Sequence, residues 1–125
     1  MKTNNTYTTT SSLLSKYTKL DHNIKLYIPS TINVNKSIDN KQYILDTLKL
    51  FSSLFGGSTS YKAQGAWDSE TQGLIVEDIA IVESYTTSDG IATSLPQVLT
   101  YATKLKKELA QEAISLEYDN QLYFI

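Results

Sequence analysis

The chain has 125 residues, a formal net charge of −2 and no cysteine. This length fits a single domain with its own hydrophobic core. The absence of cysteine excludes disulfides, thiolate catalysis and cysteine-ligated metal sites. All eleven basic residues are lysine, so the chain lacks the guanidinium groups that bind phosphate and guanine in bidentate fashion. The small net charge provides no general attraction to nucleic acid or to an anionic membrane.

Residues 1–20 are predicted to form a flexible or partly helical N-terminal arm. Residues 1–12 are rich in Thr, Ser and Asn and have no hydrophobic periodicity, which is typical of disorder and unlike a secretory signal. Apolar residues then recur at helical spacing from Leu13 to Leu20. No stretch approaches the roughly 20 apolar residues of a membrane span. We therefore expect a cytoplasmic protein without a membrane partner.

The first part of the domain reads as a strand followed by a helix. Residues 24–28 alternate between apolar and polar and end at Pro29, which predicts a strand. After a loop at 30–38, Asp39 and Gln42 have the spacing of an N-terminal capping pair. Apolar residues at helical spacing then continue up to Gly56 and Gly57, which are typical of a helix end. This stripe consists of Ile44, Leu45, Leu48, Phe51, Leu54 and Phe55.

Residues 58–86 predict a β-hairpin at the centre of the domain. We expect its strands at 58–67 and 74–86, joined by a polar turn. Both faces of the second strand are substantially apolar, which indicates a central strand covered on both sides. Acids interrupt both faces, with Asp78 on one and Glu77 and Glu83 on the other.

The last part of the chain reads as a second helix followed by short strands. Ser94 and Gln97 form a second capping pair, with Pro96 in the first turn, so we expect a loop at 87–93 and a helix after it. The apolar stripe of this helix consists of Val98, Leu99, Ala102, Leu105 and Leu109. A fourth strand is predicted at 113–118, and residues 122–125 can add a short fifth one.

The order of elements, β-α-β-β-α-β, predicts the ferredoxin-like fold of the α+β class. Residues 21–125 would then form one domain, a four-stranded antiparallel sheet with two helices on one face. The other sheet face would be open, and such faces commonly serve as a dimer interface or as the floor of a ligand site. Because the central strand is apolar on both faces, we expect a homodimer.

Aromatic and acidic side chains on the predicted sheet are the candidates for binding a ligand or a partner. Aromatic rings stack on flat ligands and are also common at interfaces. The set consists of Tyr27, Tyr61, Trp67, Glu77, Glu83 and Tyr85. Glu77 and Glu83 share a face but lie about 20 Å apart along a strand, too far for a two-carboxylate glycosidase.

The sequence indicates no catalytic residue, metal ligand or cofactor. The single histidine, His22, has no neighbouring serine or aspartate in an order that defines a catalytic triad, so we interpret it as a surface residue.

The hairpin also carries a motif. Its elements are Gly65-Ala66-Trp67, then Gly73, then Glu77, and a Gln-Glu-Ala-Ile sequence follows at 111–114. Across residues 24–118 this pattern resembles a family of small bacterial domains of unknown function. The resemblance implies the same α+β fold and brings no known activity. The small size and the Lys-, Asn-, Ile- and Tyr-rich composition also resemble those of phage- or plasmid-encoded accessory proteins.

Three functional hypotheses remain. The favoured one is a non-enzymatic binding protein, a mobile-element accessory or counter-defence factor that acts on a host protein or a small molecule. The alternative is a small dimeric ferredoxin-like enzyme with a pocket near Trp67 and Glu77. The second alternative is binding of single-stranded RNA through the sheet. Acids occupy positions where RNA-recognition motifs carry basic and aromatic residues, so nucleic acid is not the expected partner.

Overall fold

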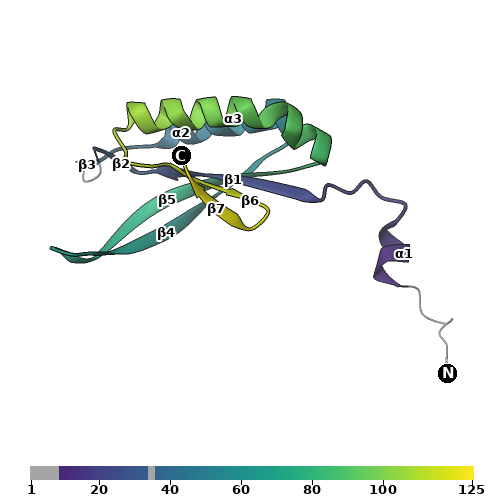
Figure 1. The fold of residues 1–125 in the computed structure, drawn as a ribbon, viewed down its shortest axis with the longest axis horizontal. Coiled ribbons are helices and arrows are strands. Elements are labelled where there is room, and N and C mark those ends of the chain that lie inside the picture. The colour runs from purple at the N-terminus through teal and green to yellow at the C-terminus, as the bar shows by residue number, and fades with distance from the viewer. Residues whose placement is uncertain (1–8, 34–35) are drawn as a thin grey trace, which may run out of the picture.

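The computed structural model describes residues 9–33 and 36–125 and shows a five-stranded antiparallel sheet in the order β4-β5-β1-β6-β7 (Figure 1). The chain is therefore an α+β protein, as predicted. The strands of this sheet are β1 (His22–Pro29), β4 (Thr59–Ser69), β5 (Gly73–Thr86), β6 (Ser115–Tyr118) and β7 (Gln121–Phe124).

Alternation along β1 determines which face of the sheet is buried. Ile24, Leu26 and Ile28 point to one face and are fully buried, and Ala80 and Val82 of β5 lie beside them in register. Helices α2 (Lys41–Phe55) and α3 (Ser88–Glu108) both cover this face, above the sheet in Figure 1. The helices contribute Phe51, Val98, Ala102 and Leu105 to the core, and Leu109, the C-cap residue of α3, adds to it.

The predicted four-stranded layout is incomplete. The turn at Asp119 and Asn120 has φ of 47° and 67°, the left-handed values of a tight two-residue hairpin turn. It returns the chain so that β7 pairs with β6 as a fifth strand. The predicted loop at 30–38 also contains a small two-stranded pair, β2 (Thr31–Ile32) with β3 (Lys36–Ser37).

Both helices begin differently from the capping predictions. In α2 the N-cap is Asn40, whose side chain makes no capping bond, and the Asp39 carboxylate accepts from the Lys41 N–H at 3.0 Å. In α3 the N-cap is Thr87, whose hydroxyl accepts from the Gly90 N–H at 3.1 Å. This helix therefore begins before Ser94, which lies buried inside it. The prediction of a helix start at Ser94 is wrong because Thr87 already caps the helix seven residues earlier.

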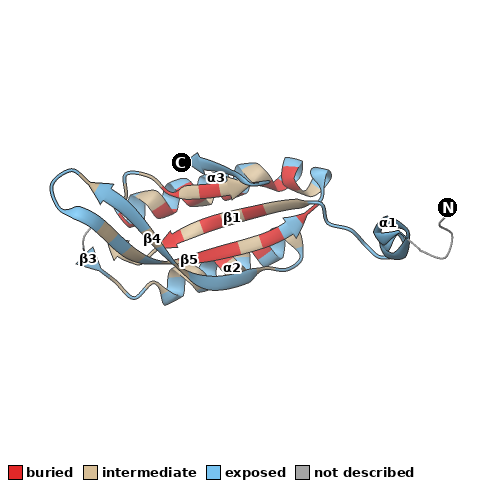
Figure 2. Cartoon of the chain, turned by 90° about the horizontal axis from the view of Figure 1, so that it is seen from below, coloured by how far each residue is buried: buried red, intermediate tan, exposed pale blue. Residues whose placement is uncertain are grey.

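No helix that the structure describes covers the second sheet face, which we call the open face. Figure 2 views the sheet from this side, and most of the buried positions coloured along β1 and the adjoining half of β5 have side chains that point away, toward the helices. Ile81 of β5 is only 8% exposed there because Tyr27 and Tyr61 flank it on the neighbouring strands. The far end of the β4–β5 hairpin extends beyond the helices, and Leu74 is 67% exposed. The prediction that this strand is covered on both faces therefore holds only near the middle of β5, where Ala80, Ile81 and Val82 are all buried.

The predicted N-terminal arm is described from residue 9 onward. Helix α1 (Thr10–Leu14) has no buried residue and extends away from the sheet in Figure 1. The rest of the arm, residues 1–8, lies outside the described residues. Among the described helices, none is long and apolar enough to cross a membrane.

The C-terminus of α2 offers a matched pair of glycine variants. Gly56 has a φ of 91°, which an L-residue adopts only with strain, whereas Gly57 is not among the glycines with positive φ, and neither has an atom within 4 Å of an added Cβ. We expect Gly56→Ala to lower the free energy of unfolding by about 1 kcal/mol. Gly57→Ala should leave it unchanged or slightly raised. Urea unfolding followed by circular dichroism measures both, and equal effects would contradict the assignment of strain to Gly56.

Candidate active site

A connected group of charged side chains lies on the open face where β5, β1 and β6 run side by side. The register pairs Lys25 with Glu83 on one side and with Glu117 on the other. The Lys25 Nζ atom is 3.7 Å from Glu83 Oε2 and 3.3 Å from Glu117 Oε2. Each side chain is less than a quarter exposed. Partial burial without a covering element makes this group a candidate ligand site.

Two further side chains complete this group, which we call the carboxylate network. The Asn23 side-chain amide donates to Glu83 Oε2 at 3.0 Å. The Tyr27 hydroxyl donates to Glu117 Oε1 at 2.9 Å. With two carboxylates and one ammonium, the network carries a formal charge of −1. It therefore favours a cationic ligand over an anionic one.

The protonation states of Lys25 and Tyr27 limit their chemistry. Burial alone lowers the pKa of Lys25, but the hydrogen bond with Glu117 and the nearby charges of Tyr61, Glu117 and Glu83 raise it above its ordinary value. Burial raises the pKa of Tyr27, and the hydrogen bond to Glu117 raises it further. Both groups therefore stay protonated at neutral pH. They can donate hydrogen bonds to a ligand but cannot act as general bases.

A cleft of about 470 Å³ lies beside this network, within the size range of small-molecule sites. It opens where α2 ends and β4 begins, and Glu83 belongs to both the cleft and the network. The Ser84 hydroxyl donates to the Gly57 carbonyl at 2.6 Å, which fixes the loop after α2 against β5. The lining residues are Leu20, Phe55, Gly56, Gly57, Ser58, Thr59, Glu83, Ser84 and Tyr85.

Four of the six residues proposed from the sequence lie around this region. Tyr27 and Glu83 are part of the network, and Tyr85 lines the cleft. Tyr61 lies on the open face of β4, next to Ile81 in register, and its charge influences the pKa of Lys25. The structure thus brings together aromatic rings and a carboxylate from three strands.

The other two residues lie farther out on the hairpin. Trp67 pairs with Ile75 near its tip, and Glu77 pairs with Gly65. Glu77 is six residues from Glu83 along the same strand, about 20 Å away. Trp67 and Glu77 therefore do not line the cleft.

Asn23, Lys25 and Glu117 were not among the residues predicted from the sequence. Alternation within β1 and β6 places each of them on the open face, and this signal was available in the sequence. Asn23 and Lys25 contact Glu83, and Lys25 contacts Glu117. These contacts depend on the register between strands about 60 and 90 residues apart in the chain, and local patterns do not encode that register. Among the described residues, no cluster of three or more His, Asp or Glu side chains could hold a metal ion.

The arrangement defines a small α+β protein with an anionic, aromatic-rimmed site on a sheet. No family model and no curated protein matches the chain. Two solved structures resemble it. A phage SAM lyase in complex with S-methyl-5′-thioadenosine aligns with a TM-score of 0.61 and 11% identity, over 83% of this chain and 88% of the other. A phage SAM lyase in the apo state aligns with a TM-score of 0.60 and 13% identity, over 83% and 87%. At this identity the similarity shows a shared fold.

These comparisons correct the functional prediction. The favoured hypothesis, a non-enzymatic binding protein, is contradicted because the structures that share the fold over most of both chains are those of an enzyme. The enzyme alternative agrees better with them. The neighbours are consistent with the predicted phage-related origin, whereas no family model supports the resemblance to the bacterial domain family.

Proposed function

We propose that this protein is a lyase that cleaves S-adenosylmethionine (SAM) and releases S-methyl-5′-thioadenosine. The fold shared with phage SAM lyase supports the reaction class. The observation that carries the proposal for this chain is the partly buried carboxylate network beside the cleft. A net negative, aromatic-rimmed site suits a ligand that carries a sulfonium and an ammonium group.

The charges of SAM complement those of the network. Glu83 and Glu117 attract the sulfonium and the ammonium, and the ammonium of Lys25 between them can receive the substrate carboxylate. Tyrosine rings attract cations through their negative faces and stack on adenine. Tyr61 and Tyr85 lie near Glu83 for these roles.

The reaction needs neither water nor a general base. An oxygen of the substrate carboxylate attacks Cγ, the Cγ–S bond breaks, and its electron pair goes to sulfur. The products are neutral S-methyl-5′-thioadenosine and an aminobutyrolactone that keeps the ammonium, so atoms and charge balance. The protein must hold the carboxylate in line with the breaking bond and exclude water. Protonated Lys25 and Tyr27 are compatible with that role.

Incubation of the purified protein with SAM, followed by chromatography and mass spectrometry, tests the proposal. We expect S-methyl-5′-thioadenosine and the lactone to form in equal amounts, with no isotope incorporated into newly formed lactone in heavy-oxygen water. S-adenosylhomocysteine, which lacks the sulfonium charge, should remain intact. Formation of S-methyl-5′-thioadenosine no faster than in buffer would refute the function.

Three finer features are also proposals. The order β4-β5-β1-β6, with α2 and α3 as crossovers, supports assignment to the ferredoxin-like group. A phage origin and a cytoplasmic location agree with a SAM-cleaving enzyme. The half-buried aromatic residues of the open face support homodimer formation through that face, which sedimentation equilibrium at micromolar concentration would detect.

A further inference from the structure

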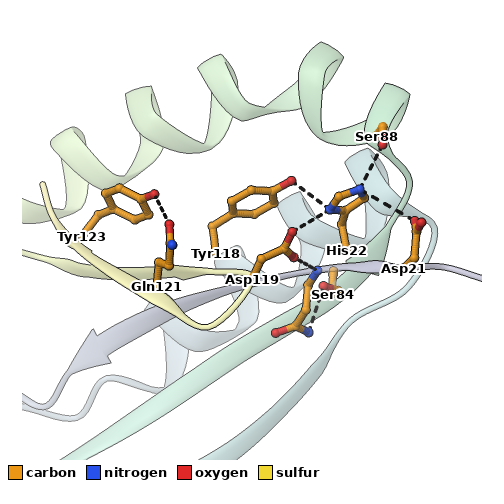
Figure 3. Close-up of polar contacts among 9 residues, drawn as sticks. Asp21, His22, Ser84, Ser88, Tyr118, Asp119, Gln121 and Tyr123 are labelled. Atoms are coloured by element: carbon orange, nitrogen blue, oxygen red, sulfur yellow. Dashed lines mark hydrogen bonds and ion pairs between the residues drawn. The ribbon is translucent and has the colours of Figure 1, made fainter.

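A second polar cluster lies where β1 begins, β6 ends and α3 starts (Figure 3). His22 is at its centre. The Nδ1 atom of His22 is 2.6 Å from Asp119 Oδ2, and the Nε2 atom is 2.9 Å from Ser88 Oγ. Serine, histidine and aspartate are thus connected in the order used by nucleophilic catalytic triads.

The surrounding contacts determine the roles of the two imidazole nitrogens. Asp119 accepts the Asn23 backbone N–H through Oδ1 at 2.9 Å, which leaves Oδ2 to accept the Nδ1–H of His22. In the neutral imidazole Nε2 is then the unprotonated nitrogen, and it accepts a hydrogen bond from the Ser88 hydroxyl. The Tyr118 and imidazole rings are stacked with centroids 5.9 Å apart, and the Tyr118 hydroxyl lies 3.0 Å from Nδ1.

Three separate elements position these side chains. His22 is the first residue of β1, Ser88 is the first residue of α3, and Asp119 lies in the left-handed turn between β6 and β7. Ser88 is exposed, and His22 and Asp119 are partly exposed. A small electrophile can therefore reach the hydroxyl of Ser88.

We propose that Ser88, His22 and Asp119 form a nucleophilic triad that accepts acyl groups from small carboxylic esters. This activity is separate from SAM cleavage. The Ser88 oxygen attacks the ester carbonyl while its proton moves to His22 Nε2. The bond to the leaving alcohol breaks and the alcohol takes that proton. Water then hydrolyses the acyl-serine in the same manner, so one ester and one water give one acid and one alcohol.

The groups that face His22 determine how this reactivity depends on pH. They are Asp119 and Tyr118 from the end of β6, Ser88 from α3, and Asp21, whose Oδ1 is 3.8 Å from Nε2. The hydrogen bond with Asp119 raises the pKa of His22, burial lowers it, and the charges of Asp119 and Asp21 raise it again, so the pKa lies above its ordinary value. Below this pKa the imidazolium cannot accept the serine proton.

A fluorophosphonate probe, which forms an Oγ–P bond to an activated serine and releases fluoride, tests the proposal. We expect intact-mass and peptide analysis of the wild-type protein to show one adduct, at Ser88. Ser88→Ala should abolish labelling, and His22→Gln or Asp119→Asn should slow it by roughly 100-fold or more. Ser60→Ala removes an exposed serine of β4 and should leave labelling unchanged.

Two further readouts separate a triad from a structural cluster. The labelling rate should rise with pH through a midpoint above the ordinary pKa of a free imidazole and then level off, and hydrolysis of p-nitrophenyl acetate should follow the same profile. SAM cleavage should persist in Ser88→Ala. Labelling of Ser88 no faster than that of Ser60 in the wild-type protein would overturn the proposal, and this comparison requires no variant to fold. Full labelling in a folded Asp119→Asn variant would also overturn it.

Discussion

Glu83→Gln is expected to lower kcat/KM for SAM by on the order of 100- to 1,000-fold while the protein stays folded. Glu83 is the one residue that belongs both to the carboxylate network and to the cleft. The amide keeps the size of the side chain and can still accept the Asn23 bond, but it removes the negative charge that would face a cationic substrate. Formation of S-methyl-5′-thioadenosine at several SAM concentrations gives kcat and KM, and circular dichroism verifies the fold.

Glu77→Gln is the matched control. It makes the same chemical change on the same face of β5, about 20 Å farther along the strand. We expect its kcat/KM to stay within about twofold of the wild type, a margin that corresponds to less than 0.5 kcal/mol. Loss of activity in Glu77→Gln with full activity in Glu83→Gln would place the site near Trp67 and Glu77 instead. Wild-type activity in both variants would show that SAM cleavage requires neither Glu83 nor Glu77.

Phe51→Ala is expected to produce the largest loss of stability, about 3–5 kcal/mol in the free energy of unfolding. Phe51 is fully buried between α2 and the sheet, and its ring packs edge-on against Phe55 with centroids 5.6 Å apart. Alanine would leave a cavity in the only large core that the described residues form. Urea unfolding by fluorescence and circular dichroism measures the change, because a lower midpoint at constant slope reports stability alone.

Leu45→Ala on the same helix provides the comparison. Leu45 is 48% exposed, so its truncation removes little buried surface, and we expect a change of about 1 kcal/mol or less. Similar losses at both positions would mean that α2 packs on the sheet through a different face.

Asn23 links the two proposed sites. Its backbone N–H donates to Asp119, and its side chain donates to Glu83. The first bond is the largest contribution to lowering the pKa of Asp119, and the second orients the acid of the cleft. Asn23 therefore donates a hydrogen bond to one carboxylate of each site, through its backbone to Asp119 and through its side chain to Glu83.

The sequence by itself determined the parts of this protein that depend on local periodicity. The apolar stripe that includes Phe51 predicted α2, and alternation with a polar turn predicted the hairpin of β4 and β5. Alternation also placed Glu77 and Glu83 on a common face of the second hairpin strand. These patterns are reliable because the side-chain directions of a helix or a strand repeat every few residues whatever the rest of the chain does.

Only the tertiary structure decided which side chains meet. Lys25, Glu83 and Glu117 come together through the register of three strands. His22 was interpreted as an isolated surface residue, yet its partners Ser88 and Asp119 lie 66 and 97 residues away in the chain. Strand pairing, the start of α3 and a left-handed turn jointly bring these residues within hydrogen-bonding distance. Such contacts arise from the packing of the whole domain, so no local pattern in the sequence indicates them.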